Sequence, residues 1–168
     1  MKKYIVIGNP IEHSLSPKLH NFWFKKNNID AVYEKKKVET NEIKDLILDL
    51  KKKKISGINV TVPFKKDVIN FLDQLSLESK ETQSVNTIFL KNDKVIGHNT
   101  DIDGFQIAIE NPMIDLKIKS ALVLGAGGVV SSIIFALNKM KVPKIILSNR
   151  TKKKAEDMKN LFNNINIV

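Results

Sequence analysis

"ALVLGAGGVVSSIIFALNKM", residues 121–140, is the stretch of sequence that decides the fold. An apolar run typical of a strand leads into a turn with Gly125, Gly127 and Gly128, and an amphipathic helical pattern follows. One glycine permits the tight bend, and the next lets an anion approach the free N–H groups at the start of the helix. The stretch predicts a dinucleotide-binding turn, although Val130 stands where the usual fingerprint has glycine or alanine.

The next expected strand, in "KIILSNRTKKK" (144–154), favours one dinucleotide over the other. NAD sites commonly place an acidic residue at the end of this strand, whereas an arginine there accommodates the 2′-phosphate of NADP. This chain has no acid there and carries Arg150, its only arginine, followed by a run of lysines. We therefore expect NADP; the alternative is a solvated basic helix start.

Strands alternate with helices along the whole chain, which predicts an α/β fold with mainly parallel sheets. A boundary near residue 103 divides residues 1–103 from 104–168, where a helix, Pro112 and a fresh strand follow. "FLKNDKV" (89–95) predicts a hairpin with Asn92 and Asp93 in the turn. The expected strands are 3–8, 32–38, 56–62, 86–90, 94–97, 121–125 and 144–148, and the expected helices are 16–28, 41–53, 65–72, 77–82, 103–110, 128–140 and 151–162.

"GINVTVPFKK" (57–66) indicates a second functional region. Its apolar residues alternate as in a buried strand, while Asn59 and Thr61 form the other face and Lys65 follows shortly after Pro63. An amide, a hydroxyl and an ammonium in line at the end of a strand suit a ligand with hydroxyl groups and a carboxylate or carbonyl.

Similar polar groups follow other expected strands, and adjacent strand ends would bring them to one cleft. Asp101 would pair with Lys65 and tune its acidity. Each group also has a simpler explanation, since asparagines make turns, serines cap helices and lysines are solvated. The groups are Ser14 and Ser16 after the first strand, Asn86 with Thr87, and Asn99 with Thr100 and Asp101.

Composition excludes several classes of protein. The chain has 168 residues and no cysteine, so disulfides and thiolate chemistry are excluded, and we expect a cytoplasmic protein. Neither a signal peptide nor an apolar run near 18 residues is present, so no membrane partner is expected. The net charge is +10, but the lysines are diffuse and aromatic residues are few, which argues against nucleic acid. The three histidines lack metal-ligand spacing, so no metal site is expected.

Six motifs in a fixed order resemble the shikimate dehydrogenase family: "GNPIEHSLSP", "NVTVPFK", "SVNT", "GHNTDIDGF", "GAGG" and "NRT". The resemblance extends over essentially the whole chain. It implies an N-terminal α/β substrate domain followed by a Rossmann-type NADP-binding domain. It also implies an NADP-dependent oxidoreductase that reduces 3-dehydroshikimate to shikimate in the biosynthesis of chorismate and the aromatic amino acids.

The resemblance also implies a role for each matching residue. Lys65 and Asp101 would be the catalytic acid–base pair, with Lys65 protonating the carbonyl oxygen as the cofactor delivers hydride. The implied substrate-binding residues are Ser14 and Ser16 on the carboxylate, with Asn59, Thr61, Lys65, Asn86 and Asp101 around the ring. The implied cofactor-binding residues are Gly125, Ala126, Gly127, Gly128 and Val129 in the turn, and Asn149, Arg150 and Thr151 at the 2′-phosphate.

The chain departs from the family in one respect: its dinucleotide-binding half has two strands, a second helix and the start of a third strand in "INIV" (165–168). We therefore expect an N-terminal portion of the enzyme, with an incomplete Rossmann domain and little or no activity alone. Exposed core faces would favour association, so a homodimer is among the expected assemblies. Two alternatives remain open: an NAD-using quinate/shikimate dehydrogenase and a non-catalytic module that binds a polyol acid.

Overall fold

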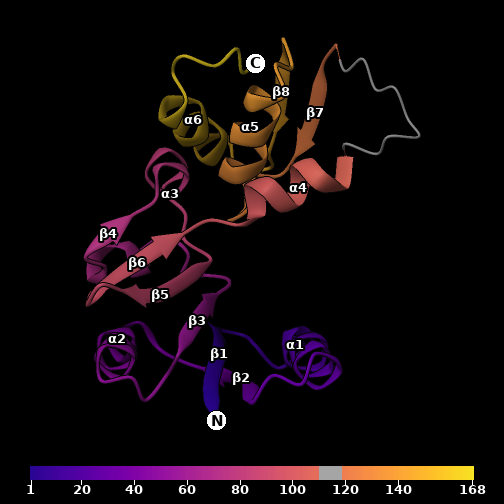
Figure 1. Ribbon diagram of the computed structural model, residues 1–168. Coiled ribbons are helices and arrows are strands. Elements are labelled where there is room, and N and C mark those ends of the chain that lie inside the picture. The colour runs from indigo at the N-terminus through magenta and orange to yellow at the C-terminus, as the bar shows by residue number, and fades with distance from the viewer. Residues whose placement is uncertain (110–118) are drawn as a thin grey trace. The chain divides into compact units, whose positions relative to one another are not determined.

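The computed structural model describes residues 1–109 and 119–168, which form two compact units (Figure 1). The first unit is Met1–Asn99 and the second is Thr100–Val168. From the sequence we placed the boundary after residue 103, which lies inside helix α4 (Asp101–Ile109) of the second unit. The last residue of the helix expected at 103–110, and Pro112, lie outside the described residues.

The described residues of the first unit form a six-stranded sheet of order β2-β1-β3-β5-β6-β4. Pairing is parallel except on the two sides of β5, which runs against its neighbours. The mainly parallel sheet expected from the sequence is thereby confirmed. The strands are β1 (Lys2–Gly8), β2 (Ala31–Lys37), β3 (Gly57–Val60), β4 (Gln74–Leu75), β5 (Thr87–Lys91) and β6 (Lys94–His98).

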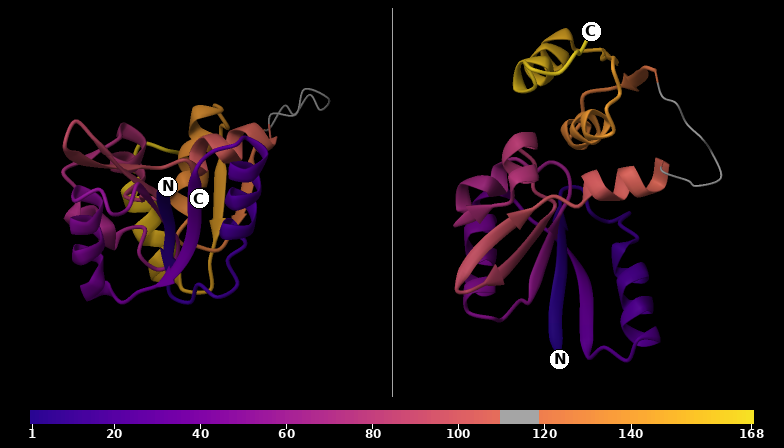
Figure 2. Two further views of the ribbon diagram at one scale, coloured as in Figure 1. Left: turned by 60° about the horizontal axis from the view of Figure 1, so that its bottom comes forward. Right: turned by 45° about the horizontal axis from the view of Figure 1, so that its top comes forward.

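Helices α1 (Ser16–Lys26) and α2 (Ile43–Lys51) cover opposite faces of this sheet, as both views of Figure 2 show. The period of two along β1 explains the arrangement. Ile5 and Ile7 join the larger core with α2, whereas Val6 packs with Tyr33 in a smaller cluster beside α1. Both faces of the central strand are thus buried from Ile5 to Gly8. In α/β sheets, ligands bind at the ends of the strands.

The turn between β5 and β6 is the predicted one, because Asn92 and Asp93 both have positive φ values, of 51° and 56°. This backbone matches the twist of the two paired strands. The expected helix at 65–72 was wrong in type: the segment contains the short 3₁₀ helix η2 (Asp67–Phe71). Helix α3 (Leu77–Thr82) has the predicted bounds, and a 3₁₀ turn, η1 (Thr40–Glu42), precedes α2.

The second unit contains α4, β7 (Ala121–Leu124), α5 (Val130–Lys139), β8 (Ile145–Ser148) and α6 (Lys152–Leu161). Strands β7 and β8 are parallel and α5 connects them, as predicted for a β-α-β unit. Ile167 forms a parallel bridge to Ile145, so the expected start of a third strand pairs with β8. Ile134 and Ile145 are fully buried in a core that belongs to this unit alone.

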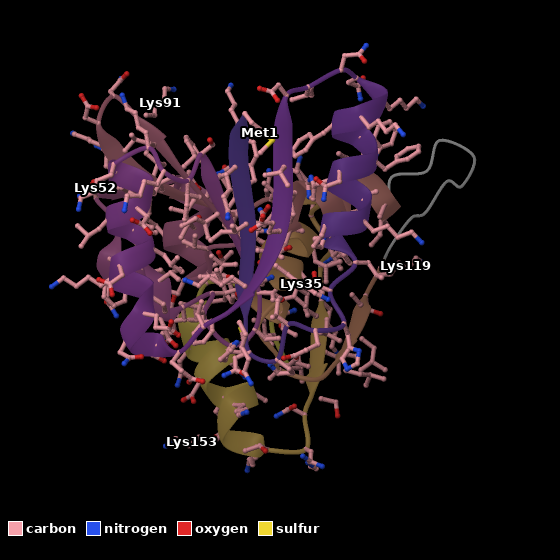
Figure 3. All side chains as sticks on the ribbon, turned by 90° about the horizontal axis from the view of Figure 1, so that it is seen from below. Met1, Lys35, Lys52, Lys91, Lys119 and Lys153 are labelled. Carbon is pink, nitrogen blue, oxygen red and sulfur yellow. The ribbon has the colours of Figure 1, made fainter. Side chains whose placement is uncertain are left out.

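The positive charge of the chain is distributed over many elements. Within the first unit, Lys35 on β2, Lys52 after α2 and Lys91 at the end of β5 lie apart from one another (Figure 3). The absence of nucleic-acid binding remains a prediction. Within residues 1–109 and 119–168, no helix has the length and apolar character needed to cross a bilayer.

Candidate functional site

The polar edge of the first sheet is the candidate site. Because β5 is antiparallel, its first residue lies beside the last residues of β3 and β6, and Thr87 pairs with both Asn59 and His98. Asn86 precedes β5 at the same edge, where its N–H donates to the carbonyl oxygen of His98 over 3.1 Å. The predicted convergence of strand ends therefore holds for Asn59, Asn86 and Thr87.

Hydrogen bonds join these side chains into one network. Asn59 Nδ2 donates to the main-chain oxygen of Asn86 over 3.2 Å and to Thr87 Oγ1 over 3.1 Å. Thr87 donates to Asn86 Oδ1 over 3.0 Å, and the Tyr33 hydroxyl donates to Asn59 Oδ1 over 2.7 Å. Both amide hydrogens of Asn59 are thus used inside the protein, so direct contact between Asn59 and a ring hydroxyl stays a prediction that would need the second lone pair of Oδ1.

Thr61 and Lys65 lie beside this network on the segment that follows β3. The Thr61 N–H donates to the main-chain oxygen of Ile7 over 2.9 Å, and this bond holds the end of β3 against β1. Lys65 is half-buried, and its main-chain oxygen accepts from the N–H of Val85, the residue before Asn86, over 2.8 Å. The backbone at Lys65 is thereby fixed to the start of β5.

Close packing explains a glycine at the end of β1. A Cβ added to Gly8 would lie 2.6 Å from Thr61 Cγ2 and 3.0 Å from the main-chain oxygen of Val62. Any side chain at Gly8 would displace the Thr61 side chain from its present position.

Ser14 and Ser16 lie at the start of α1, and both are half-buried. Ser14 Oγ accepts from the Ser16 N–H over 3.4 Å, and the helix has no side-chain cap on its first turn. Helix capping was the simpler explanation for these serines. The bond from the Ser16 N–H to Ser14 Oγ is long, and it is the only support that the described geometry gives to that explanation. An exposed helix start with two hydroxyls suits a carboxylate.

Asp101 belongs to the second unit, where it begins α4, while Lys65 belongs to the first. Their pairing therefore remains a prediction. Asn99 ends the first unit and is buried, with its Nδ2 donating to Thr82 Oγ1 over 3.1 Å. Asn99 is thus tied to α3.

The glycine turn of the second unit requires glycine at one position. Gly125 has a φ of +102°, which only glycine adopts without strain. A Cβ added to Gly127 would meet no atom within 4 Å, so the turn has open space at that point. Helix α5 begins three residues later, at Val130, which is buried.

Asn149 links the two strand ends of this unit. Its Oδ1 accepts from the N–H of Ala126 over 3.1 Å, and its Nδ2 donates to the main-chain oxygen of Thr151 over 2.7 Å. Arg150 is exposed beside it and precedes three lysines at the start of α6. The geometry thus holds the turn and presents a cation at the adjacent strand end, which fits a dinucleotide with a 2′-phosphate.

Sequence reasoning missed three residues that support the first site: His20, Asn21 and Tyr33. The His20 and Tyr33 rings stack, with centroids 4.2 Å apart and planes at 10°. The Asn21 side chain donates to the main-chain oxygen of Tyr33 over 2.8 Å and accepts from its N–H over 2.9 Å. The available signal was Tyr33 itself, since a tyrosine whose ring is buried needs a partner for its hydroxyl.

Among the described residues, no group of three or more His, Cys, Asp or Glu side chains has an arrangement that could hold a metal ion. The expectation of no metal site remains a prediction. Burial lowers the pKa of His20 and raises the pKa of Tyr33 to about 12. Both side chains are therefore neutral at pH 7, and the Tyr33 hydroxyl keeps its hydrogen.

A polar-edged α/β unit followed by a β-α-β unit with a glycine turn defines the class of protein: a two-unit α/β protein with a dinucleotide-type second unit. Residues 6–88 match the family model of the shikimate dehydrogenase substrate binding domain. The chain is 56% identical over 167 residues to shikimate dehydrogenase (NADP(+)) of Pelagibacter ubique, a match that covers 99% of this chain and 63% of the relative. This chain belongs to the shikimate dehydrogenase family.

Solved structures show the same fold. A crystal structure of shikimate dehydrogenase from Aquifex aeolicus is 40% identical with a TM-score of 0.89, covering 100% of this chain and 62% of that one. A Thermus thermophilus shikimate 5-dehydrogenase, solved in complex with NADP(H) and shikimate, is 29% identical with a TM-score of 0.88. It covers 100% of this chain and 63% of that one. The α/β class and its Rossmann-like second part are thereby confirmed.

Proposed function

We propose that this chain forms the substrate-binding part and the first half of the cofactor-binding part of an NADP-dependent shikimate dehydrogenase. The observation that carries the proposal is the convergence of Asn59, Thr87 and Asn86 at one sheet edge, beside Lys65. The 56% identical relative is named for this activity, and the Thermus thermophilus structure contains both shikimate and NADP(H).

The second unit fits the cofactor, because the turn around Gly127 has open space and Arg150 stands at the neighbouring strand end. The reduced cofactor, NADPH, would supply the hydride in the direction of reduction and would become NADP+. Gly125, Ala126, Gly127, Gly128 and Val129 would hold its pyrophosphate, and Arg150 would hold its 2′-phosphate at the strand end that Asn149 and Thr151 shape. The net reaction converts a ring ketone to a secondary alcohol.

The first unit would bind and orient the substrate. Ser14 and Ser16 would bind its carboxylate, and Thr61, Asn59 and Asn86 would contact the ring hydroxyls. Lys65 would give its proton to the carbonyl oxygen as the C–H bond forms and would then take up a proton from water, with Asp101 as its predicted acid–base partner.

The test separates binding from turnover. Shikimate is titrated into the 168-residue chain and binding is followed by NMR, while turnover is measured as NADPH formation. A second protein, in which this chain is followed by the remaining C-terminal part of the Pelagibacter ubique relative, is assayed in parallel. We expect binding by both proteins and rapid turnover by the longer one.

Lys65→Ala in the longer protein should lower turnover by about 10²–10⁴-fold, the usual contribution of a general acid. Lys66→Ala is the matched control, because Lys66 is the exposed neighbour on the same segment. Binding without turnover in the longer protein would favour a non-catalytic module, and turnover with NAD at least as fast as with NADP would favour the quinate/shikimate alternative.

A further inference from the structure

The direction of the hydrogen bonds at the sheet edge is fixed by one group that cannot donate. The main-chain oxygen of Asn86 faces the Asn59 amide at 3.2 Å, so the Asn59 atom nearest to it must be the NH₂ nitrogen. Asn59 Oδ1 then faces Tyr33, and the Tyr33 hydroxyl has to donate over 2.7 Å. The Asn59 orientation that this oxygen selects is therefore compatible only with a Tyr33 hydroxyl that donates its hydrogen.

The same logic extends to Asn86. The second hydrogen of the Asn59 amide occupies a lone pair of Thr87 Oγ1, so the Thr87 hydroxyl hydrogen points elsewhere and donates to Asn86 Oδ1 over 3.0 Å. Because Oδ1 of Asn86 faces Thr87, the NH₂ group lies on the other side of that amide. The chain of bonds runs in one direction, from Tyr33 through Asn59 and Thr87 to Asn86.

Tyr33 is held more firmly than a contact residue requires. Its side chain is 4% exposed, its main-chain N–H and C=O are both bonded to the side chain of Asn21, and its ring stacks on His20. Burial raises the pKa of the phenol to about 12, so the hydroxyl keeps its hydrogen at neutral pH. His20 and Asn21 come from α1, whose first residue is Ser16.

We propose that Tyr33 is a positioning residue, which through Asn59 and Thr87 fixes the orientation of the Asn86 amide. The proposal rests on the proposed function, since it assigns a supporting partner to a predicted ligand of shikimate. It also gives a role to His20 and Asn21, which hold Tyr33 in place. It also assigns the two amide hydrogens of Asn59 to the support of the site.

The first test follows the side-chain amides in the ligand-free 168-residue chain by ¹⁵N–¹H NMR. Tyr33→Phe removes only the hydroxyl and keeps a ring against His20. We expect it to shift the side-chain amide signals of both Asn59 and Asn86. Tyr4→Phe, which alters the only other tyrosine in the chain, should shift neither. An unchanged Asn86 side-chain signal in a folded Tyr33→Phe protein would overturn the proposal.

The second test measures shikimate binding by NMR titration of four variants. Tyr33→Phe and Thr87→Val should each weaken binding about fivefold, the effect of one lost neutral hydrogen bond, and the double variant should bind no more weakly than either single one. Thr87→Ser, which keeps the hydroxyl, should bind as the wild type does. Additive losses in the double variant would overturn the proposed route from Tyr33 through Thr87. Equal losses in Thr87→Ser and Thr87→Val would overturn it too, because the effect would then not depend on the Thr87 hydroxyl.

The two proposals fail in different ways. If the wild-type chain does not bind shikimate, the proposed function fails, while the side-chain amide signals of the ligand-free chain still decide whether Tyr33 orients Asn86. If the wild type binds and Tyr33→Phe changes neither the Asn86 signal nor the affinity, only the positioning role is lost.

Discussion

At the scale of single residues, Asn149 and Arg150 show that neighbours in one motif have different tasks. Asn149 bonds to the backbone on two sides, at Ala126 and Thr151, whereas Arg150 is exposed. The side chain of Asn149 thus shapes the turn, and Arg150 supplies charge. A dinucleotide without a 2′-phosphate needs the first contribution and does not need the second.

Arg150→Gln should therefore weaken NADP binding about tenfold or more, since hydrogen bonds to charged groups are worth about 1.5–3 kcal/mol, and should leave NAD binding unchanged. Asn149→Ala should weaken the binding of NADP and NAD alike. Titration calorimetry of both cofactors on both variants measures the four affinities. Equal losses for the two cofactors in Arg150→Gln would contradict the assigned contact with the 2′-phosphate.

His20 gives a prediction of pH dependence. Burial lowers its pKa from the ordinary value of 6.5, so the unfolded chain takes up the proton more readily than the folded one. The stability of the first unit should then fall as the pH drops below 6.5 toward the lower folded pKa, and His20 should have no effect above that window. Urea unfolding at pH 7.5 and 5.5, followed by the fluorescence of the single tryptophan, Trp23, measures the change.

The control is His20→Phe, which keeps an aromatic ring over Tyr33 and cannot titrate. The pKa values of Glu12 and Asp73 are both lowered, chiefly by hydrogen bonds from the backbone, so these groups lose their protons well below pH 5.5 and do not interfere. A loss of stability between pH 7.5 and 5.5 that is as large in His20→Phe as in the wild type would refute the prediction.

At the scale of the element, local patterns predicted most strands and helices, and what they missed has physical causes. Strand β4 was missed because two residues cannot show a period of two. The segment after Pro63 has apolar residues at near-helical spacing, yet it forms the short 3₁₀ helix η2, in which Val68 is buried in the core. The strand predicted at 56–62 is shorter in the structure, because β3 ends at Val60, before Pro63.

Sequence patterns also placed Asn59 and Asn86 at strand ends, but they could not show that Tyr33 joins them. Tyr33 lies 26 residues from Asn59 in the chain and reaches it across β1, which separates β2 from β3. That contact depends on the order of strands in the sheet, which no local pattern carries. The pairing of Lys65 with Asp101 is of the same kind and stays a prediction.

Gly97 tests how tightly the elements of the first unit pack. A Cβ at this position would lie 2.5 Å from Leu72, 2.9 Å from Leu75 and 2.9 Å from Val85, so three side chains would have to move together. We expect Gly97→Ala to lower the free energy of unfolding by about 2 kcal/mol, as overpacking does. Denaturant unfolding followed by Trp23 fluorescence gives the value.

Gly57→Ala is the graded control in the same sheet. There the added Cβ would meet only the ring of Tyr4 at 3.0 and 3.2 Å, together with an ordinary contact at 3.6 Å. One ring can shift more easily than three packed side chains, so the loss should be smaller, about 1 kcal/mol or less. The packing argument fails if Gly57→Ala is the more damaging substitution.

At the scale of the whole molecule, each unit has a core of its own. Ile88 is 1% exposed in the core of residues 1–99, and Ile134 is fully buried in the core of residues 100–168. Each cluster of buried hydrophobic residues lies entirely within one of the two units. A cavity in one core therefore removes contacts from that unit only, and the two units should lose stability separately.

Ile88→Ala and Ile134→Ala form a matched pair for this prediction, because each removes the same atoms from a fully buried site. Each should cost about 2–5 kcal/mol in its own unit, since the cavity adds to the lost burial. Hydrogen exchange read by mass spectrometry should show faster exchange across residues 1–99 in Ile88→Ala and across residues 100–168 in Ile134→Ala, with the other unit unchanged. Faster exchange throughout the chain in either variant would mean that the two units unfold together, and it would refute the prediction that they lose stability separately.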